Sequence, residues 1–233
     1  MQLDSISALI DAVDSPTWRA TLHKFYDENK ALMLTTPASH KLHHCWPGGY
    51  HDHIMEVMHN TYQMMALVQD PLVYRRNFTL DEALIAAFIH DLDKLFLRYE
   101  LDTKPPSAAQ IGYASSLGIK NARGESSAGL SHMIDLINSG CKIDYDRVPR
   151  HRNKARIAGS DVVDALTLAA KHGFELTPMI IHAVTYHHGG WTKGMGEHDQ
   201  VEPIAALIHA ADLLSAAAQN QRHRDVPIAV TTT

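Results

Sequence analysis

Histidine is the residue type whose number and placement most strongly suggest chemistry in this chain. Of the 233 residues, 17 are histidines. Six lie between His40 and His59, five lie between His182 and His209, and the dipeptide His90-Asp91 lies between the two groups. A single histidine usually packs in a core or lies on a surface. Two clusters with a His-Asp pair between them indicate a shared metal site, because imidazole and carboxylate groups together bind divalent transition metals.

Two aspartates in apolar surroundings point to the same kind of site. Asp91 follows bulky apolar residues, and Asp212 lies within IAALIHAADLLSAA, with His209 three residues earlier on the same helix face, where it could support the site. A buried carboxylate needs a neutralising partner, which is a metal ion, an arginine or a helix terminus. The candidate metal ligands are His53, His90, Asp91 and Asp212. Two nitrogens and two oxygens fit Mn²⁺, Fe²⁺, Co²⁺ or Zn²⁺, with Mg²⁺ less favoured by the imidazoles.

Helices are expected to position these residues. Caps such as Thr79 followed by Glu82, and Thr177 followed by Pro178, mark helix starts, and apolar residues recur three and four positions apart. His53 would begin one helix, and His90-Asp91 would lie well inside another. No segment alternates with period two, so the predicted fold class is all-α. The predicted helices cover residues 16–31, 54–68, 79–96, 130–138, 161–171, 177–187 and 204–219.

The length and composition favour one elaborated globular domain. The hydrophobic fraction is 45% and the charged fraction 20%, which are ordinary values. The middle of the chain is rich in Gly, Ser and Ala, and it is expected to be an irregular, partly basic insertion. The expected parts of this single domain are an N-terminal helical extension (1–40), a part with the first His and His-Asp motifs (41–100), the insertion (101–159), C-terminal helices with the late His and Asp motifs (160–220) and a tail (221–233).

Charge and cysteine usage exclude several classes of protein. A net charge of −5 and a pI near 6.4 argue against a broad nucleic-acid-binding face. No apolar run approaches the ~18–20 residues that span a bilayer, so no membrane partner is expected. The N-terminal residues carry acids rather than the basic start of a secretory signal. Two cysteines provide no disulfide framework, and a cytoplasmic location is therefore expected.

The order of the candidate ligands resembles a known superfamily. His53, His90-Asp91 and Asp212 follow the H…HD…D order of the HD-domain metal-dependent phosphohydrolases. The local motifs are closest in style to those of the HD domain of 3′–5′ exoribonucleases. They are HHCWPGGYHDHIMEV, AAFIHDLDKL, AVTYHHGG and EPIAALIHAADLLSA, which together cover residues 43–216. The resemblance implies a single compact HD-domain helical bundle in which metal-activated water hydrolyses a phosphate ester or anhydride.

The resemblance also implies roles for residues beside the ligands. Lys94 matches the family lysine that contacts phosphate, although a lysine there could equally complement a helix dipole. Asp93 replaces the usual glycine and adds a candidate acid or base. His182, His187 and His188 are candidates for a second metal site or for proton transfer. One metal ion is the expectation, with a second left open, because the region 101–159 offers no clean counterpart for a further family histidine.

Two segments are candidates for substrate binding. His43 and His44 precede the Gly-Gly turn and either line the mouth of the site or are ordinary loop histidines. The segment Lys142–Arg156 holds six Lys or Arg residues against two Asp residues. With Arg150 and Arg152 it forms either a clamp for phosphates or a solvated charged loop.

Three functions remain after these considerations. The favoured one is hydrolysis of a nucleotide (a dNTP, an NTP or a nucleoside monophosphate), because the chain is acidic and its first 40 residues leave no room for an added nucleic-acid-binding domain. A single-strand 3′–5′ exonuclease or phosphodiesterase is the alternative that the motif style favours, with short single-stranded nucleic acid as partner. A non-catalytic nucleotide-binding HD module is the third, against which the intact ligand set argues.

Overall fold

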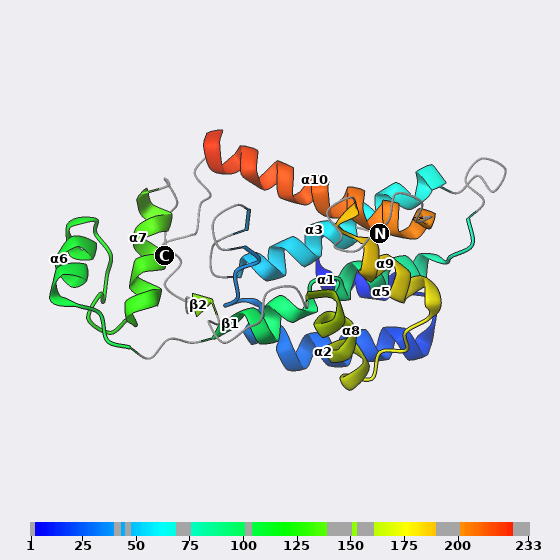
Figure 1. Ribbon diagram of the computed structural model, residues 1–233, viewed down its shortest axis with the longest axis horizontal. Helices are drawn as coiled ribbons and strands as arrows, with labels where there is room; N and C mark the ends of the chain where they lie inside the picture. The colour runs from blue at the N-terminus through cyan, green and yellow to red at the C-terminus, as the bar shows by residue number, and fades with distance from the viewer. Residues whose placement is uncertain are drawn as a thin grey trace. The chain divides into compact units, whose positions relative to one another are not determined.

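A computed structural model describes residues 3–39, 43–44, 48–68, 76–100, 104–138, 151–152, 161–189 and 201–225, and their fold class is all-α as predicted (Figure 1). The α-helices are α1 (Ile6–Asp11), α2 (Pro16–Met33), α3 (Gly49–Met64), α5 (Leu80–Ile89), α6 (Ala108–Ser116), α7 (Ser127–Asn138), α8 (Asp161–Lys171), α9 (Pro178–Tyr186) and α10 (Pro203–Asp225). A 3₁₀-helix, η1 (Met65–Val68), directly follows α3. A π-helix, η2 (Lys94–Arg98), follows α5 after a short turn. None of the described helices is both long enough and apolar enough to cross a membrane.

Extended structure is nearly absent from the described residues. The pairing found there joins β1 (Tyr99–Glu100) and β2 (His151–Arg152), which are antiparallel and two residues long each. Such a short bridge does not alter the all-α fold class.

Contacts divide the chain into two compact units. The first unit comprises Met1–Lys30, His53–Asp93 and Ile157–Ser215, and the second comprises Ala31–Asp52, Lys94–Arg156 and Ala216–Thr233. The four candidate metal ligands all belong to the first unit. The two units are therefore described separately.

Helix α5 is the centre of the first unit. It packs against α8 and α9, and its residues Asp81–Ile89 are all buried. Phe88 on this helix meets the edge of Phe25 from α2, with the ring centroids 5.7 Å apart, and Phe25 also meets Phe174. The sequence pattern predicted an apolar stripe, whereas the helix is buried around its whole circumference. A helix that is apolar on all sides is typical of such a position.

Two buried carboxylates at the start of α5 connect it to neighbouring segments. Thr79 and Glu82 form the predicted capping box. Asp81 accepts a hydrogen bond of 2.8 Å from the backbone N–H of Ser15, directly before α2. Glu82 accepts one of 2.7 Å from the hydroxyl of Thr177, which caps α9. These bonds explain how the two carboxylates are buried without a large desolvation penalty.

Helix α5 ends earlier than the sequence pattern predicted. The expectation that His90-Asp91 lies inside the helix is wrong, because the regular helix ends at Ile89 and His90 is its C-cap. The His90 side chain bends back to the carbonyl oxygen of Ala87, at 2.8 Å, and the chain then turns into the π-helix η2. Irregular helical turns of this kind are frequent at functional sites.

Helix α3 begins earlier than predicted, at Gly49 rather than at His53. Gly48 has a φ of 84°, which supplies the turn that glycine tolerates. Gly49 must also lack a side chain, because a Cβ there would overlap the carbonyl oxygen of His44. Gly48 and Gly49 therefore form the start of the helix and its close contact with the preceding backbone. His53 lies within the first two turns of the helix.

The second unit contains a helical pair that the sequence pattern did not predict in full. Helices α6 and α7 pack together over a small core of Ala114, Ile119, Ala122, Leu130 and Met133. Region 101–159 is thus not irregular throughout. The capping box that starts α6 is formed by Ser107 and Gln110, within the segment that the composition predicted to be irregular.

Candidate metal centre

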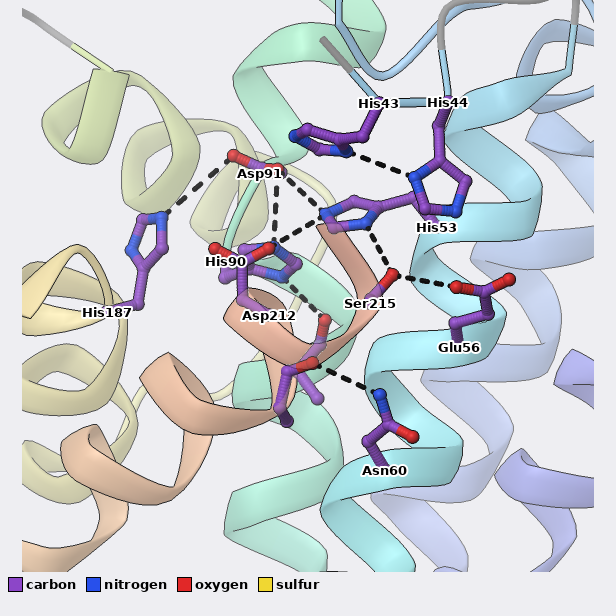
Figure 2. Close-up of polar contacts among 12 residues, drawn as sticks. His43, His44, His53, Glu56, Asn60, His90, Asp91, His187, Asp212 and Ser215 are labelled. Carbon is purple, nitrogen blue, oxygen red and sulfur yellow. Dashed lines mark hydrogen bonds and ion pairs between the residues drawn. The ribbon is translucent and has the colours of Figure 1, made fainter. Parts of the chain in front are cut away.

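The candidate metal centre lies where the C-terminal ends of α5 and α9 meet residues within α3 and α10 (Figure 2). His53 comes from α3, Asp212 comes from α10, and His90-Asp91 follows directly after α5. A further imidazole, from His187, is the C-cap of α9. The side chains of His53 and His90 are fully buried, that of Asp91 is 5% exposed and that of Asp212 is 20% exposed.

The imidazole rings direct their Nε2 atoms at the two carboxylates. His53 Nε2 lies 3.4 Å from Asp91 Oδ2 and 3.3 Å from Asp212 Oδ1. His90 Nε2 lies 3.2 Å from Asp91 Oδ2, and His187 Nε2 lies 4.0 Å from Asp91 Oδ1. Ligand atoms of His53, His90 and Asp91 lie within 4.8 Å of one another, as do those of His90, His187 and Asp212. This spacing suits donors that surround a metal ion.

Backbone carbonyls fix the tautomer of two of these histidines. His90 Nδ1 lies 2.8 Å from the carbonyl oxygen of Ala87, and His187 Nδ1 lies 2.6 Å from that of Val184. A carbonyl oxygen only accepts, so each Nδ1 carries the proton and donates it. The neutral ring then presents the Nε2 lone pair, which is the atom that points toward the carboxylates. Metal-binding histidines in proteins are oriented in this way.

The electrostatic environment favours the cation-binding forms of His187 and Asp212. Burial lowers the pKa of His187 to about 3, with further lowering by His90 and His188, so this ring is neutral at neutral pH. Burial alone would raise the pKa of Asp212, but the close approach of the His53 and His90 imidazoles outweighs it, and the net shift is downward. Neutral imidazole and ionised carboxylate are the protonation states that metal binding requires.

The donor set could hold a metal ion. A buried carboxylate such as that of Asp91, which is 5% exposed, is costly unless a cation or hydrogen-bond donors neutralise it. Nitrogen and oxygen donors in this mixture bind Mn²⁺, Fe²⁺, Co²⁺ and Zn²⁺. His53, His90, Asp91 and Asp212 are thus brought together as a group that could hold a metal ion.

His187 and His188 lie near Asp91, whereas His182 does not belong to the same group. His188 is half-buried and stacks on His187 with the ring centroids 3.8 Å apart, and the two form a further group with Asp91. His182 lies elsewhere on α9. Its Nε2 accepts a 3.0 Å hydrogen bond from the backbone N–H of Glu202, and its ring packs on Tyr186. Among the described residues, the groups that could hold a metal include His187 and His188 but not His182.

The candidate acid and the substrate-binding candidates lie in several places. Asp93 is buried and does not belong to the ligand groups found among the described residues. Lys94 is half-buried at the start of η2, in the second unit. His43 and His44 also belong to the second unit, with their Nδ1 atoms 3.0 Å apart. Arg150 and the side chain of Arg152 lie outside the described residues.

Sequence reasoning missed Ser215, which contacts the candidate ligand His53, and Glu56, which contacts Ser215. Ser215 Oγ lies 3.1 Å from His53 Nδ1 and donates a 3.0 Å hydrogen bond to Glu56 Oε2. The spacing offered a signal, because Ser215 follows Asp212 by three residues and Glu56 follows His53 by three. Residues three apart share a helix face.

Comparison of the chain with protein-family models, with curated proteins and with solved structures gives no match. The assignment of chemistry to the site therefore depends on its residues and their geometry.

Proposed function

We propose that the chain is a metal-dependent phosphohydrolase of the HD type that acts on nucleotides. The observation that carries this proposal is the convergence of the Nε2 atoms of His53, His90 and His187 on Asp91. The order of ligands along the chain, His then His-Asp then a late Asp, supports the HD type. His53, His90, Asp91 and Asp212 would hold one divalent ion.

A divalent ion, when bound, polarises a phosphoryl oxygen and activates water for attack at neutral pH. The chain supplies the fixed positions: Nδ1 contacts orient the rings of His90 and His187, and burial keeps bulk water away from Asp91. His187 is buried and anchored, which suits a ligand. His188 is half-buried beside it and is better placed to exchange a proton with solvent.

A nucleotide substrate is supported by charge. The net charge of −5 disfavours a protein that binds long nucleic acids through a broad basic face. The local basic segment 142–156 and Lys94 would provide a limited number of phosphate contacts, as a nucleotide needs. A single-strand exonuclease would use the same site, so the choice of substrate separates the two.

The test uses the full chain stripped of metal and reloaded separately with Mn²⁺, Fe²⁺, Co²⁺, Zn²⁺ or Mg²⁺. Each form is incubated with nucleoside mono-, di- and triphosphates and with single-stranded oligonucleotides. Release of phosphate or pyrophosphate from free nucleotides, dependent on metal and lost in Asp91→Ala, is the expected result. His23→Ala, which removes a surface imidazole paired with Asp11, serves as the matched control and should behave as wild type.

Other outcomes contradict parts of the proposal. Shortening of oligonucleotides without hydrolysis of free nucleotides would identify an exonuclease instead. Nucleotide binding without turnover under all metals would identify a non-catalytic module. Activity that persists in Asp91→Ala would reject the assigned metal centre.

A further inference from the structure

We propose that Glu56, acting through Ser215, selects the metal-binding tautomer of His53. This inference rests on the metal centre proposed above and concerns residues that do not themselves bind the metal. Figure 2 shows the three side chains in a row, with His53 between Ser215 on one side and the two carboxylates on the other. His53 and Ser215 are both buried, with 0% and 1% exposure.

The direction of the two hydrogen bonds follows from counting protons. A serine hydroxyl has one proton to donate, and a carboxylate oxygen only accepts. Ser215 donates its proton to Glu56 Oε2 over 3.0 Å. In its 3.1 Å contact with His53 Nδ1, Ser215 Oγ must therefore accept. The proton of the neutral His53 ring consequently lies on Nδ1, and Nε2 carries the lone pair.

This arrangement opposes the tautomer that the metal-free site would otherwise favour. Asp91 and Asp212 lie 3.4 Å and 3.3 Å from His53 Nε2, and two carboxylates attract a proton to that nitrogen. A ring protonated on Nε2 has no lone pair to offer a metal there. If Glu56 did not take the serine proton, Ser215 could donate to Nδ1 and so favour the unsuitable tautomer. Glu56 thus decides which way the serine hydroxyl points.

Glu56 and Ser215 lie on α3 and α10, the helices that also carry His53 and Asp212. Glu56 lies one turn after His53 on α3, and Ser215 lies one turn after Asp212 on α10. A separate bond joins these helices, because Asn60 on α3 donates from Nδ2 to the carbonyl oxygen of Ala211 over 3.2 Å. Asn60 does not act on the His53 ring through this bond. It therefore provides a control for the loss of one hydrogen bond between the same helices.

The first measurement is made on the metal-free protein labelled with ¹⁵N-histidine. Two-bond ¹H–¹⁵N correlation spectra distinguish the Nδ1–H and Nε2–H tautomers, and His53→Gln identifies the His53 signals. The wild type is expected to show Nδ1–H. Ser215→Ala and Glu56→Gln should move the ring toward Nε2–H, since a glutamine amide can donate to Ser215 and release the hydroxyl proton to His53. Asn60→Ala should leave the tautomer unchanged.

The second measurement is metal affinity, by competition with a chromogenic chelator using Mn²⁺, Co²⁺ and Zn²⁺. Ser215→Ala and Glu56→Gln should weaken binding by roughly 10–100-fold, the usual effect of losing a partner of a liganding histidine. Ser215→Thr retains the hydroxyl and should restore the affinity. Asn60→Ala should bind as the wild type does. Circular dichroism checks that each variant is folded, and the near-isosteric Glu56→Gln keeps the test available if Ser215→Ala unfolds.

Two results would overturn the inference. One is a wild-type His53 ring protonated on Nε2 in the metal-free protein. The other is a loss of affinity in Asn60→Ala equal to that in Ser215→Ala, which would make the serine contact a general link between helices. The tautomer is read without metal or substrate, so failure of the proposed hydrolase activity would leave this inference standing, and the reverse also holds.

Discussion

His209 Nδ1 donates a hydrogen bond of 2.7 Å to the carbonyl oxygen of His187. Helix α10 therefore contributes Asp212 to the candidate metal centre and also supports the turn that carries a second candidate ligand. The expected position of His209 on the same face as Asp212, three residues away, agrees with this contact. One face of α10 thus meets both His53, through Ser215, and the end of α9.

The contact between His209 and the turn after α9 can be tested with a pair of substitutions. Gly189 has a φ of 56°, and a Cβ there would lie 2.9 Å from His209 Nε2. Gly189→Ala should destabilise the protein by about 1–2 kcal/mol from the backbone conformation alone, and by more because of the clash. In a His209→Ala background the same change should cost less, because the clash is gone. Chemical denaturation of the four proteins measures both values, and equal costs in both backgrounds would contradict the contact.

Asp91 should be the residue on which metal binding most depends, since it faces three imidazoles. Asp91→Ala is expected to remove both metal and activity while leaving a helical circular dichroism spectrum. Elemental analysis of the purified variant gives the metal content directly. Full occupancy in Asp91→Ala would exclude it as a ligand, and His23→Ala should retain the wild-type content.

The four candidate ligands could be singled out from the sequence because the prediction depends on residue types and their order, and the structure brings them together as groups that could hold a metal ion. The choice between His182 and His187 could not be made in this way. The two lie five residues apart on α9, which turns them about 140° from each other around the helix. The packing of α9 determines which of the two side chains faces the carboxylates. In this packing His187 faces them, whereas His182 accepts a hydrogen bond from the backbone N–H of Glu202. The sequence contains no local signal for that register.

Helix ends likewise differ in whether the local sequence predicts them. Thr79 and Thr177 were recognisable caps because their partners lie three residues away in the sequence. The end of α5 before His90-Asp91 was missed because it depends on a side chain that bends back to Ala87 and on the π-helix that follows. Helix α6 was missed for a different reason. Its cap at Ser107 lies in the Gly-, Ser- and Ala-rich middle of the chain, where the composition favoured irregular structure.

Thr177 should contribute more to stability than an ordinary helix cap. Its hydroxyl accepts from the backbone N–H of Ile180 and donates to the buried Glu82. Thr177→Ala removes both bonds and should cost about 1–3 kcal/mol. Thr177→Ser keeps the hydroxyl and should cost less. Ser5→Ala removes a cap that bonds only its own helix in the contacts found there, and should cost about 0.5–1 kcal/mol in the same denaturation experiment.

His187 and His188 should differ from packing residues in their effect on turnover. Replacing both with Ala is expected to lower turnover per folded molecule by ~10²-fold or more, the scale of lost ligand or acid–base function. His187→Ala alone should also reduce metal content, whereas His188→Ala should leave it near the wild-type value. Steady-state kinetics and elemental analysis on the same preparations separate these effects. Unchanged kinetics in the double variant would show that the pair only packs.

The number of phosphates on the substrate should distinguish Lys94 from the basic segment. A lysine beside the reacting phosphoryl group stabilises charge in the transition state, so Lys94→Ala is expected to lower kcat for every substrate. Contacts from Arg150 and Arg152 would instead meet the other phosphates. Replacing both with neutral residues should raise KM for a nucleoside triphosphate far more than for a monophosphate. The difference should correspond to a loss of about 1–2 kcal/mol of binding free energy at low salt. Equal effects on mono- and triphosphates would make the segment an ordinary charged surface, and an effect confined to oligonucleotides would favour the exonuclease.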